Sequence, residues 1–191
     1  MISTTQPIKT RRSTRGFTLT EVMISATISS FIMLGILQTF MMIGRTGYNA
    51  SNYCVMEAQS RRAMETFSQE IRMAQSIVWS SDTSITLTIP TAASTYDVQY
   101  AYDASTSGST AQSFYRMDLS GVRILVKNVT SLAFQRYKLV TGAVSNIASN
   151  DLETKQIQLT LQTTMKGMTT AAATNAVLSA RYILRNKDVS S

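Results

Sequence analysis

The sequence contains no histidine and a single cysteine, Cys54. Histidine is the commonest general base and metal ligand near neutral pH, and a zinc site needs several cysteine or histidine ligands. One cysteine also excludes an intramolecular disulfide. No P-loop GxxxxGK[ST], nucleophile elbow GxSxG or zinc HExxH motif is present. These absences predict a protein that is not an enzyme and has no cofactor.

Oxygen ligands for calcium are also scarce. Asp97, Asp103 and Asp151 are expected in or beside loops. Three carboxylates that lie so far apart in the sequence do not make the oxygen cage that calcium requires. We therefore assign no metal site, and calcium on these residues is the minor alternative.

Acidic residues are absent before Glu21. Residues 1–16 carry four cations, and without them the net charge of the chain falls from +7 to +3. These cations are Lys9, Arg11, Arg12 and Arg15. A basic flank beside a membrane span follows the positive-inside rule. The basic character is therefore mostly a property of the N-terminal flank, and binding to nucleic acid is not expected.

The segment from Val22 to Ile43 has no charged residue and no proline, and its only strongly polar side chain is Gln38. Its 22 residues would rise about 33 Å as a helix, enough to cross the hydrocarbon core of a bilayer. We predict a transmembrane and assembly helix over residues 17–43. Ser25, Ala26, Ser29 and Ser30 form pairs of small residues four apart, which let helices pack closely in lipid; ordinary variation is an equal alternative.

The sequence Gly16-Phe17-Thr18-Leu19-Thr20-Glu21 lies between the basic flank and the apolar run. It resembles the N-terminal signal of type IV pilins and type II secretion pseudopilins. The resemblance covers about thirty residues and departs mildly at Thr20, where an aliphatic residue is commoner. It implies that prepilin peptidase cuts after Gly16, which removes residues 1–16 as a cytoplasmic leader peptide. Phe17 would then become the N-methylated first residue.

Glu21 would be the fifth residue of that mature chain, where the family has a glutamate. A carboxylate at the edge of the hydrocarbon is costly unless it has a partner. The partner that the resemblance implies is the amino group of Phe17 in a neighbouring subunit, and such a pair would set the axial register between subunits. In the alternative, Glu21 is only an exposed cap among the lipid headgroups.

Residues 44–79 are predicted to continue the helix as an amphipathic segment. Its apolar and small side chains recur at spacings of three and four on one face: Tyr53, Ser60, Met64, Phe67, Ile71, Ala74 and Val78. We expect Met64, Phe67, Ile71 and Ala74 to form the core between the helix and a sheet. Gly44 and Gly47 weaken a helix, so we place local flexibility there.

Residues 80–191 are predicted to form a β-rich head of about five to seven antiparallel strands, which makes the fold class α+β. Alternating apolar residues indicate strands at 85–89, 98–102, 114–119, 122–126, 132–139, 157–165 and 178–184. A hairpin is expected around Ser120-Gly121, with Leu119 opposite Val122 and Asp118 opposite Arg123. A polar loop is expected at 141–150, and a loop of small residues at 166–176.

The resemblance implies a minor pilin or pseudopilin in the inner membrane, with its N-terminus cytoplasmic and its head periplasmic or extracellular. Its partners would be other pilin subunits, prepilin peptidase and the inner-membrane assembly platform. The segment Ala180–Asn186 is similar to the end of J-type minor pseudopilins and W-type minor pilins, which favours these subfamilies. The chain also lacks the disulfide-closed C-terminal loop of many major pilins, and this favours a tip or priming subunit over the bulk repeat. Two alternatives remain: a DNA-binding minor pilin of a transformation pilus, and a single-pass anchored adhesin or receptor that never assembles.

Overall fold

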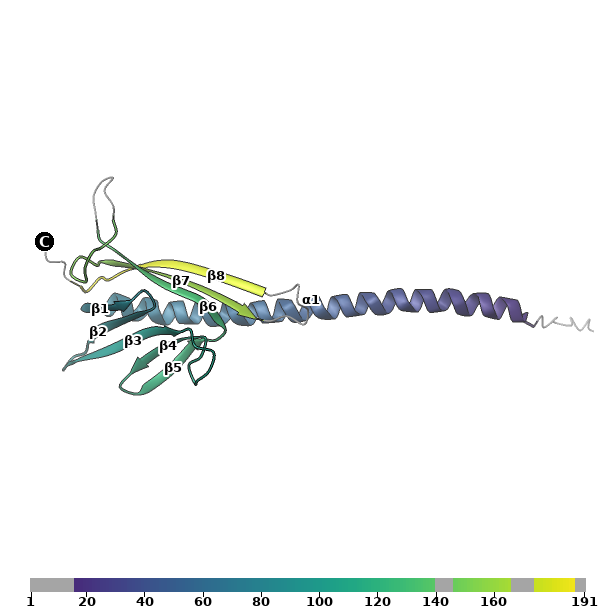
Figure 1. The fold of residues 1–191 in the computed structure, drawn as a ribbon, viewed down its shortest axis with the longest axis horizontal. Coiled ribbons are helices and arrows are strands. Elements are labelled where there is room, and N and C mark those ends of the chain that lie inside the picture. The colour runs from purple at the N-terminus through teal and green to yellow at the C-terminus, as the bar shows by residue number, and fades with distance from the viewer. Residues whose placement is uncertain (1–15, 140–145, 166–173, 188–191) are drawn as a thin grey trace, which may run out of the picture. The chain divides into compact units, whose positions relative to one another are not determined.

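The structure is a computed structural model, and it describes residues 16–139, 146–165 and 174–187. In these residues one helix, α1 (Leu19–Met73), precedes eight strands. The strands are β1 (Ser76–Ser81), β2 (Ser84–Pro90), β3 (Thr95–Asp103), β4 (Ser113–Asp118), β5 (Gly121–Val126), β6 (Val129–Tyr137), β7 (Gln156–Met165) and β8 (Thr174–Ile183). This arrangement confirms the predicted α+β class (Figure 1).

The chain forms two compact units, which divide between Gly44 and Arg45. The described part of the first unit is Gly16–Phe17–Thr18 and the α1 segment up to Gly44, and every one of these residues is exposed. The second unit contains the remainder of α1 and all eight strands. The division falls at the glycines for which the sequence predicted flexibility, and it separates two chemically different parts of one helix.

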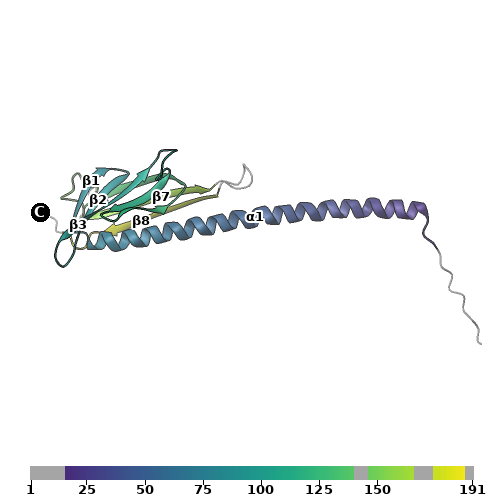
Figure 2. The same cartoon turned by 90° about the horizontal axis from the view of Figure 1, so that it is seen from below.

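The strands of the second unit form two antiparallel sheets, β1-β2-β3-β4-β5 and β6-β7-β8. The sequence predicted a single sheet of fewer strands, and it missed β1. Both sheets lie on the same side of the α1 segment that belongs to this unit (Figure 2). Each therefore covers the helix with one face, and a single hydrophobic core includes residues from α1 and from both sheets.

Phe67 lies at the centre of that core and is fully buried. Its ring centroid lies 5.0 Å from that of Tyr100 on β3, 5.8 Å from that of Phe134 on β6 and 5.4 Å from that of Tyr182 on β8. One helical side chain thus contacts both sheets. Aromatic pairs at such distances add to the free energy gained by burial.

The helix ends earlier than the sequence predicted. Residues 44–79 were expected to be helical, but α1 stops at Met73 and β1 begins at Ser76. Val78, placed by its spacing on the buried helical face, lies on β1 and is 54% exposed. The Ser76–Ser81 segment forms a hairpin with β2, with Ile77 opposite Leu87, and this strand pairing overrides the helical spacing.

The β4–β5 hairpin exists, but its predicted register is wrong by one residue on each strand. Asp118 pairs with Gly121, so Leu119 and Ser120 form the turn, and Arg123 lies opposite Arg116. The backbone N–H of Ser120 donates to the Asp118 carboxylate at 2.8 Å, and Gly121 has φ +117°. An Asp at the first position of a turn and a Gly with positive φ at the fourth are a known turn signature, and they place the turn one residue earlier than predicted. The apolar side chains stay on the predicted face, because the pairing shifts by an even number of residues.

Other loop predictions are tested only in part. The 141–150 loop and the 166–176 loop lie largely outside the described residues, as does the tail from Asp188. Within the described part, β8 begins at Thr174, so the last three residues of the predicted 166–176 loop belong to a strand.

Candidate functional site

The start of α1 is held by a reciprocal cap between Thr18 and Glu21. The Glu21 backbone N–H donates to the Thr18 hydroxyl oxygen at 3.3 Å, while the Thr18 backbone N–H and hydroxyl each donate to Glu21 Oε2 at 2.9 Å. This is the capping box of a Thr-x-x-Glu sequence. The spacing of Thr18 and Glu21 is the sequence signal for this cap, which the prediction for Glu21 as a single acid did not include. In the isolated chain the carboxylate therefore already has a local partner.

Hydroxyl groups along the apolar part of α1 bond back to the helix itself. Ser25 donates to the Glu21 carbonyl at 2.7 Å, Ser30 to the Ala26 carbonyl at 2.8 Å, and Thr39 to the Gly35 carbonyl at 2.9 Å. Such bonds satisfy the hydroxyls inside the helix. The polar atoms are thus compatible with hydrocarbon, where an unpaired donor costs several kcal/mol.

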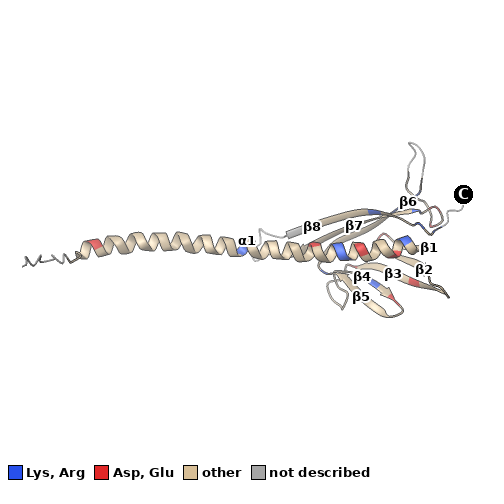
Figure 3. Cartoon of the chain, turned by 180° about the vertical axis from the view of Figure 1, so that it is seen from behind, with Lys and Arg blue, Asp and Glu red and all other residues tan. Residues whose placement is uncertain are grey.

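In the part of the chain that the structure describes, the apolar side chains of this segment are exposed. The described residues contain one helix long and apolar enough to cross a membrane, α1, and none of its most apolar window is buried. Figure 3 shows no Lys, Arg, Asp or Glu between Glu21 and the basic residue that follows the apolar run, Arg45. Exposed apolar surface on this scale indicates a lipid or protein environment supplied from outside.

The predicted packing residues Ser25, Ala26, Ser29 and Ser30 are all exposed on this segment. Gly16 and Phe17 precede the helix and are exposed, with Phe17 87% exposed, so the backbone between them is accessible to an enzyme. The leader cations Lys9, Arg11, Arg12 and Arg15 lie outside the described residues.

The four side chains predicted for the helix–sheet core, Met64, Phe67, Ile71 and Ala74, are buried in the second unit. Beside them lies a polar cluster that the sequence did not predict. Glu70 on α1 accepts hydrogen bonds from Arg116 Nε at 2.9 Å and 3.1 Å and from the Tyr100 hydroxyl at 2.5 Å.

Arg116 also forms an ion pair with Asp118, and the Glu70 and Arg116 side chains are only 12% and 13% exposed. Burial and then the hydrogen bond to Glu70 raise the pKa of Tyr100, so the phenol remains a donor. The hydrogen bond from Arg116 lowers the pKa of Asp118. This cluster joins α1 to β3 and β4.

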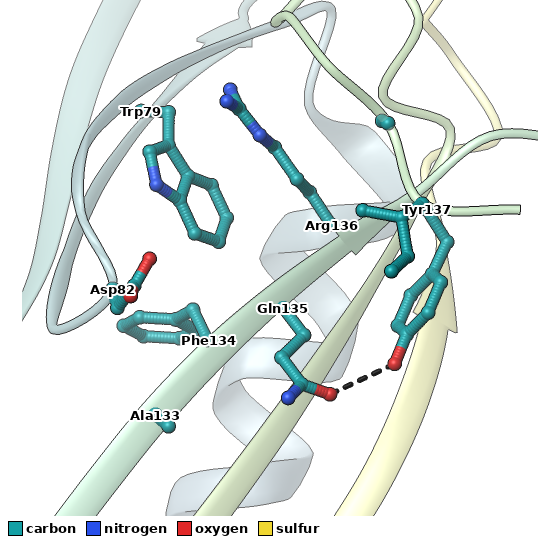
Figure 4. A pocket seen from close by; sticks show the side chains of 9 residues that line it. Trp79, Asp82, Ala133, Phe134, Gln135, Arg136 and Tyr137 are labelled. Carbon is teal, nitrogen blue, oxygen red and sulfur yellow. Dashed lines mark hydrogen bonds between the residues drawn. The ribbon is translucent and has the colours of Figure 1, made fainter.

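A depression with a volume of about 390 Å³ lies in the second unit beside β6. Figure 4 shows Trp79, Asp82, Phe134, Gln135, Arg136 and Tyr137 around it. The Arg136 guanidinium lies 5.1 Å from the centroid of the Trp79 ring and forms an ion pair with Asp151. The Tyr137 hydroxyl donates to Gln135 at 2.8 Å. Most polar groups here are already paired with one another.

The carboxylates considered for calcium are also engaged and do not converge. Asp97 accepts from Thr88, Asp103 accepts from Ser105 and Thr110, and Asp151 binds Arg136. Among the described residues there is no group of three or more histidine, cysteine or acidic side chains that could hold a metal ion.

Comparison with known proteins locates the strongest signal at the N-terminus. Residues 11–37 match the family model of the prokaryotic N-terminal methylation motif. No curated protein matches the chain. The matched range includes Gly16, Phe17 and Glu21 and ends within the uncovered apolar helix. The motif and that helix together support a type IV pilin-like protein that is processed by prepilin peptidase and anchored in a membrane.

Proposed function

We propose that the chain is a minor pilin or pseudopilin, a structural subunit that is held in the inner membrane and then assembled through its N-terminal helix into a type IV pilus or type II secretion pseudopilus. The observation that carries the proposal is the pairing of the methylation motif at residues 11–37 with an apolar helix that no described residue of the chain covers. A helix whose whole circumference is apolar is stable in lipid or inside a bundle of similar helices.

Processing is the first step of the proposal. Prepilin peptidase cuts after Gly16, and the basic leader with Lys9, Arg11, Arg12 and Arg15 stays on the cytoplasmic side. The cut creates an α-amino group on Phe17, which is then methylated. Phe17 lies outside α1 and is exposed, so the new terminus is free to reach another chain.

Assembly is the second step, and Glu21 is its specific contact. Both bonds from Thr18 end on Oε2 of the Glu21 carboxylate. Oε1 is then available to accept a bond from the Phe17 amino group of a neighbouring subunit. In the low dielectric of a helix bundle an unpaired carboxylate is costly, so this pair favours a single axial offset between subunits. The small residues Ser25, Ala26, Ser29 and Ser30 would allow close approach along the same helix.

Features of the second unit favour one position of the subunit within the filament. One cysteine excludes the disulfide-closed C-terminal loop of many major pilins, and the closing segment Ala180–Asn186 is similar to that of J-type pseudopilins and W-type minor pilins. These features favour a tip or priming subunit over the bulk repeat. The partners are other pilin subunits and the assembly platform, with the head on the periplasmic or extracellular side.

Processing is tested by the intact mass of the chain expressed with and without a prepilin peptidase. With the peptidase we expect a product that begins at Phe17 and carries one added methyl group. A product that still contains residues 1–16 would overturn the proposal and favour an anchored receptor or adhesin.

Assembly is tested by crosslinking in native membranes, followed by identification of the neighbouring chains. We expect pilin-like neighbours, and we expect Glu21→Ala to be processed normally while its crosslinks fall at least about tenfold. Gln38→Ala is the matched control, because Gln38 is the other strongly polar residue of the same segment. Equal crosslinking by wild type and Glu21→Ala would contradict the assigned role of Glu21.

A further inference from the structure

A groove of about 260 Å³ lies between α1 and β5 in the second unit. The helix contributes Gln59, Arg62, Ala63 and Thr66, and the strand side contributes Arg123, Ile124, Leu125 and Lys127. The groove is separate from the apolar helix and from the depression beside β6.

The charge of this groove is positive and uncompensated. Arg62, Arg123 and Lys127 line it, and no Asp or Glu does. The ion pairs found in the described part of the chain use Arg61, Arg116 and Arg136, and none uses these three cations. Three cations in one groove repel one another, which costs little free energy in water. An anionic partner that binds there replaces this repulsion with attraction.

One wall of the groove is a free sheet edge. β5 is the last strand of its sheet and pairs only with β4. Outside that ladder, no backbone hydrogen bond involves residues 121–126 among the described residues. The free N–H and C=O groups of an edge strand can pair with an added extended segment. A bulge in β5 between Ile124 and Val126 limits the regular edge to residues 121–124.

The two faces of β5 differ in chemistry. Arg123 lies opposite Arg116, which contacts Glu70 on α1, so this pair faces the helix. Val122 lies opposite Met117 on the other face, and both are exposed. Side chains alternate between faces along a strand. A segment that alternates acidic and apolar residues would therefore match both faces.

Two other occupants fit less well. A second copy of β5 would bring the same cations together, and like charges directly opposite one another are destabilising. A nucleic acid would gain from only about three phosphate contacts, and no aromatic side chain lines the groove for base stacking.

We propose that this groove binds an extended acidic segment of a partner protein, which pairs with the edge of β5 and places its carboxylates against Arg62, Arg123 and Lys127. The binding does not depend on Glu21 or on filament assembly, so it can fail or succeed independently of the proposed function.

The test uses the full chain in a maltoside detergent and a fluorescent peptide of alternating glutamate and valine. We expect saturable binding by anisotropy, and at least about tenfold weaker binding to the variant Arg62→Glu/Arg123→Glu/Lys127→Glu. The control variant Arg72→Glu/Lys138→Glu/Arg185→Glu has the same net charge but alters cations outside the groove, and should bind within about twofold of wild type. No binding to wild type, or equal loss in both variants, overturns the proposal.

The proposed pairing of the peptide with β5 is tested separately. These measurements use modified peptides and the wild-type chain, so they do not depend on whether a variant folds. A peptide N-methylated at alternate backbone nitrogens keeps its charge but cannot form the ladder, so it should bind at least about tenfold more weakly. Bound peptide should slow hydrogen exchange at residues 121–124 and leave β8, the edge of the other sheet, unchanged. Equal binding of the methylated peptide overturns the proposal. Tighter binding of an oligothymidylate, lost in the Arg62/Arg123/Lys127 variant, assigns the groove to nucleic acid and also overturns it.

Discussion

The two parts of α1 are both helical, but only in the second are apolar side chains buried by other described residues of the chain. Up to Gly44 every described residue is exposed, including large side chains such as Phe31 and Phe40. Beyond Arg45, a stripe that includes Met64, Phe67 and Ile71 is buried by the two sheets of the same chain. The first part must obtain its apolar environment from lipid or from neighbouring helices, whereas the second obtains it from its own sequence. The same helical geometry therefore serves intermolecular contact in one part and folding in the other.

The largest expected effect is on stability, and it comes from comparing a buried phenylalanine in the second part of α1 with an exposed one in the first. Phe67→Ala removes a fully buried ring that contacts both sheets and should destabilise the second unit by about 3–5 kcal/mol. Phe31→Ala is the matched control, since its exposed ring contributes nothing to the head and should cost less than about 0.5 kcal/mol. Denaturant titration followed by the fluorescence of Trp79, the single tryptophan, reports the unfolding of the second unit alone. Similar midpoints for the two variants would contradict the comparison.

A smaller effect tests the polar contact between α1 and the five-stranded sheet. Glu70→Ala leaves the Arg116 guanidinium and the Tyr100 hydroxyl without their shared acceptor, so we expect a loss of about 2 kcal/mol in the unfolding free energy.

Its matched control on the same helix is Glu57→Ala. That variant breaks the Glu57–Arg61 pair, in which the Arg61 side chain is 69% exposed, and should cost at most about 0.5 kcal/mol. The same tryptophan-detected titration measures both variants, and equal costs would show that the Glu70 cluster does not hold the helix on the sheet.

The head should also have a pH-dependent stability to which Val22–Ile43 contributes nothing, because that segment contains no titratable side chain. Hydrogen bonds from Arg116 hold the pKa of Asp118 below its usual value, and those from Ser105 and Thr110 do the same for Asp103. A carboxylate with a lowered folded-state pKa stabilises the fold above its unfolded pKa and loses that contribution as pH falls through the folded pKa.

Head stability should therefore decrease as the pH falls below about 4. Denaturant midpoints measured from pH 7 to pH 3 test this expectation. Asp118→Asn should flatten part of the decrease, and a wild-type midpoint that rises on acidification would contradict the assignment.

The smallest effect concerns the first turn of α1. Thr18→Ala removes the hydroxyl that accepts from the Glu21 backbone N–H, so amide exchange in the first turn should be about fivefold faster while the head midpoint stays unchanged. Thr39→Ala is the control, because the Thr39 hydroxyl bonds to a helical carbonyl and caps nothing. Unchanged exchange in Thr18→Ala would mean that the capping box does not stabilise the helix start.

Much of the fold could be predicted because its signals are local. The run from Val22 to Ile43 predicts a helix by length and composition, and alternating residues predict most strands. The predicted hairpin register was wrong because the prediction placed Ser120-Gly121 at the centre of the turn, whereas Asp118 and Gly121 flank a turn of Leu119 and Ser120. The apolar alternation is the same in both registers, so it could not decide between them. Glu21 was predicted as a functional residue from the sequence, but its bonds with Thr18 were not, although the spacing that allows them is visible there.

The sequence by itself determined the uncovered helix, since a long uncharged segment with an acid at its start needs no distant residue to define it. Only the tertiary structure decided where that helix ends, because Ser76–Ser81 becomes a strand by pairing with β2. The tertiary structure alone also places Arg116 beside Glu70, and Arg62 beside Arg123 and Lys127. These groups are separated by dozens of residues in the chain, and no local pattern specifies which distant side chains share a groove once two sheets have packed on one helix.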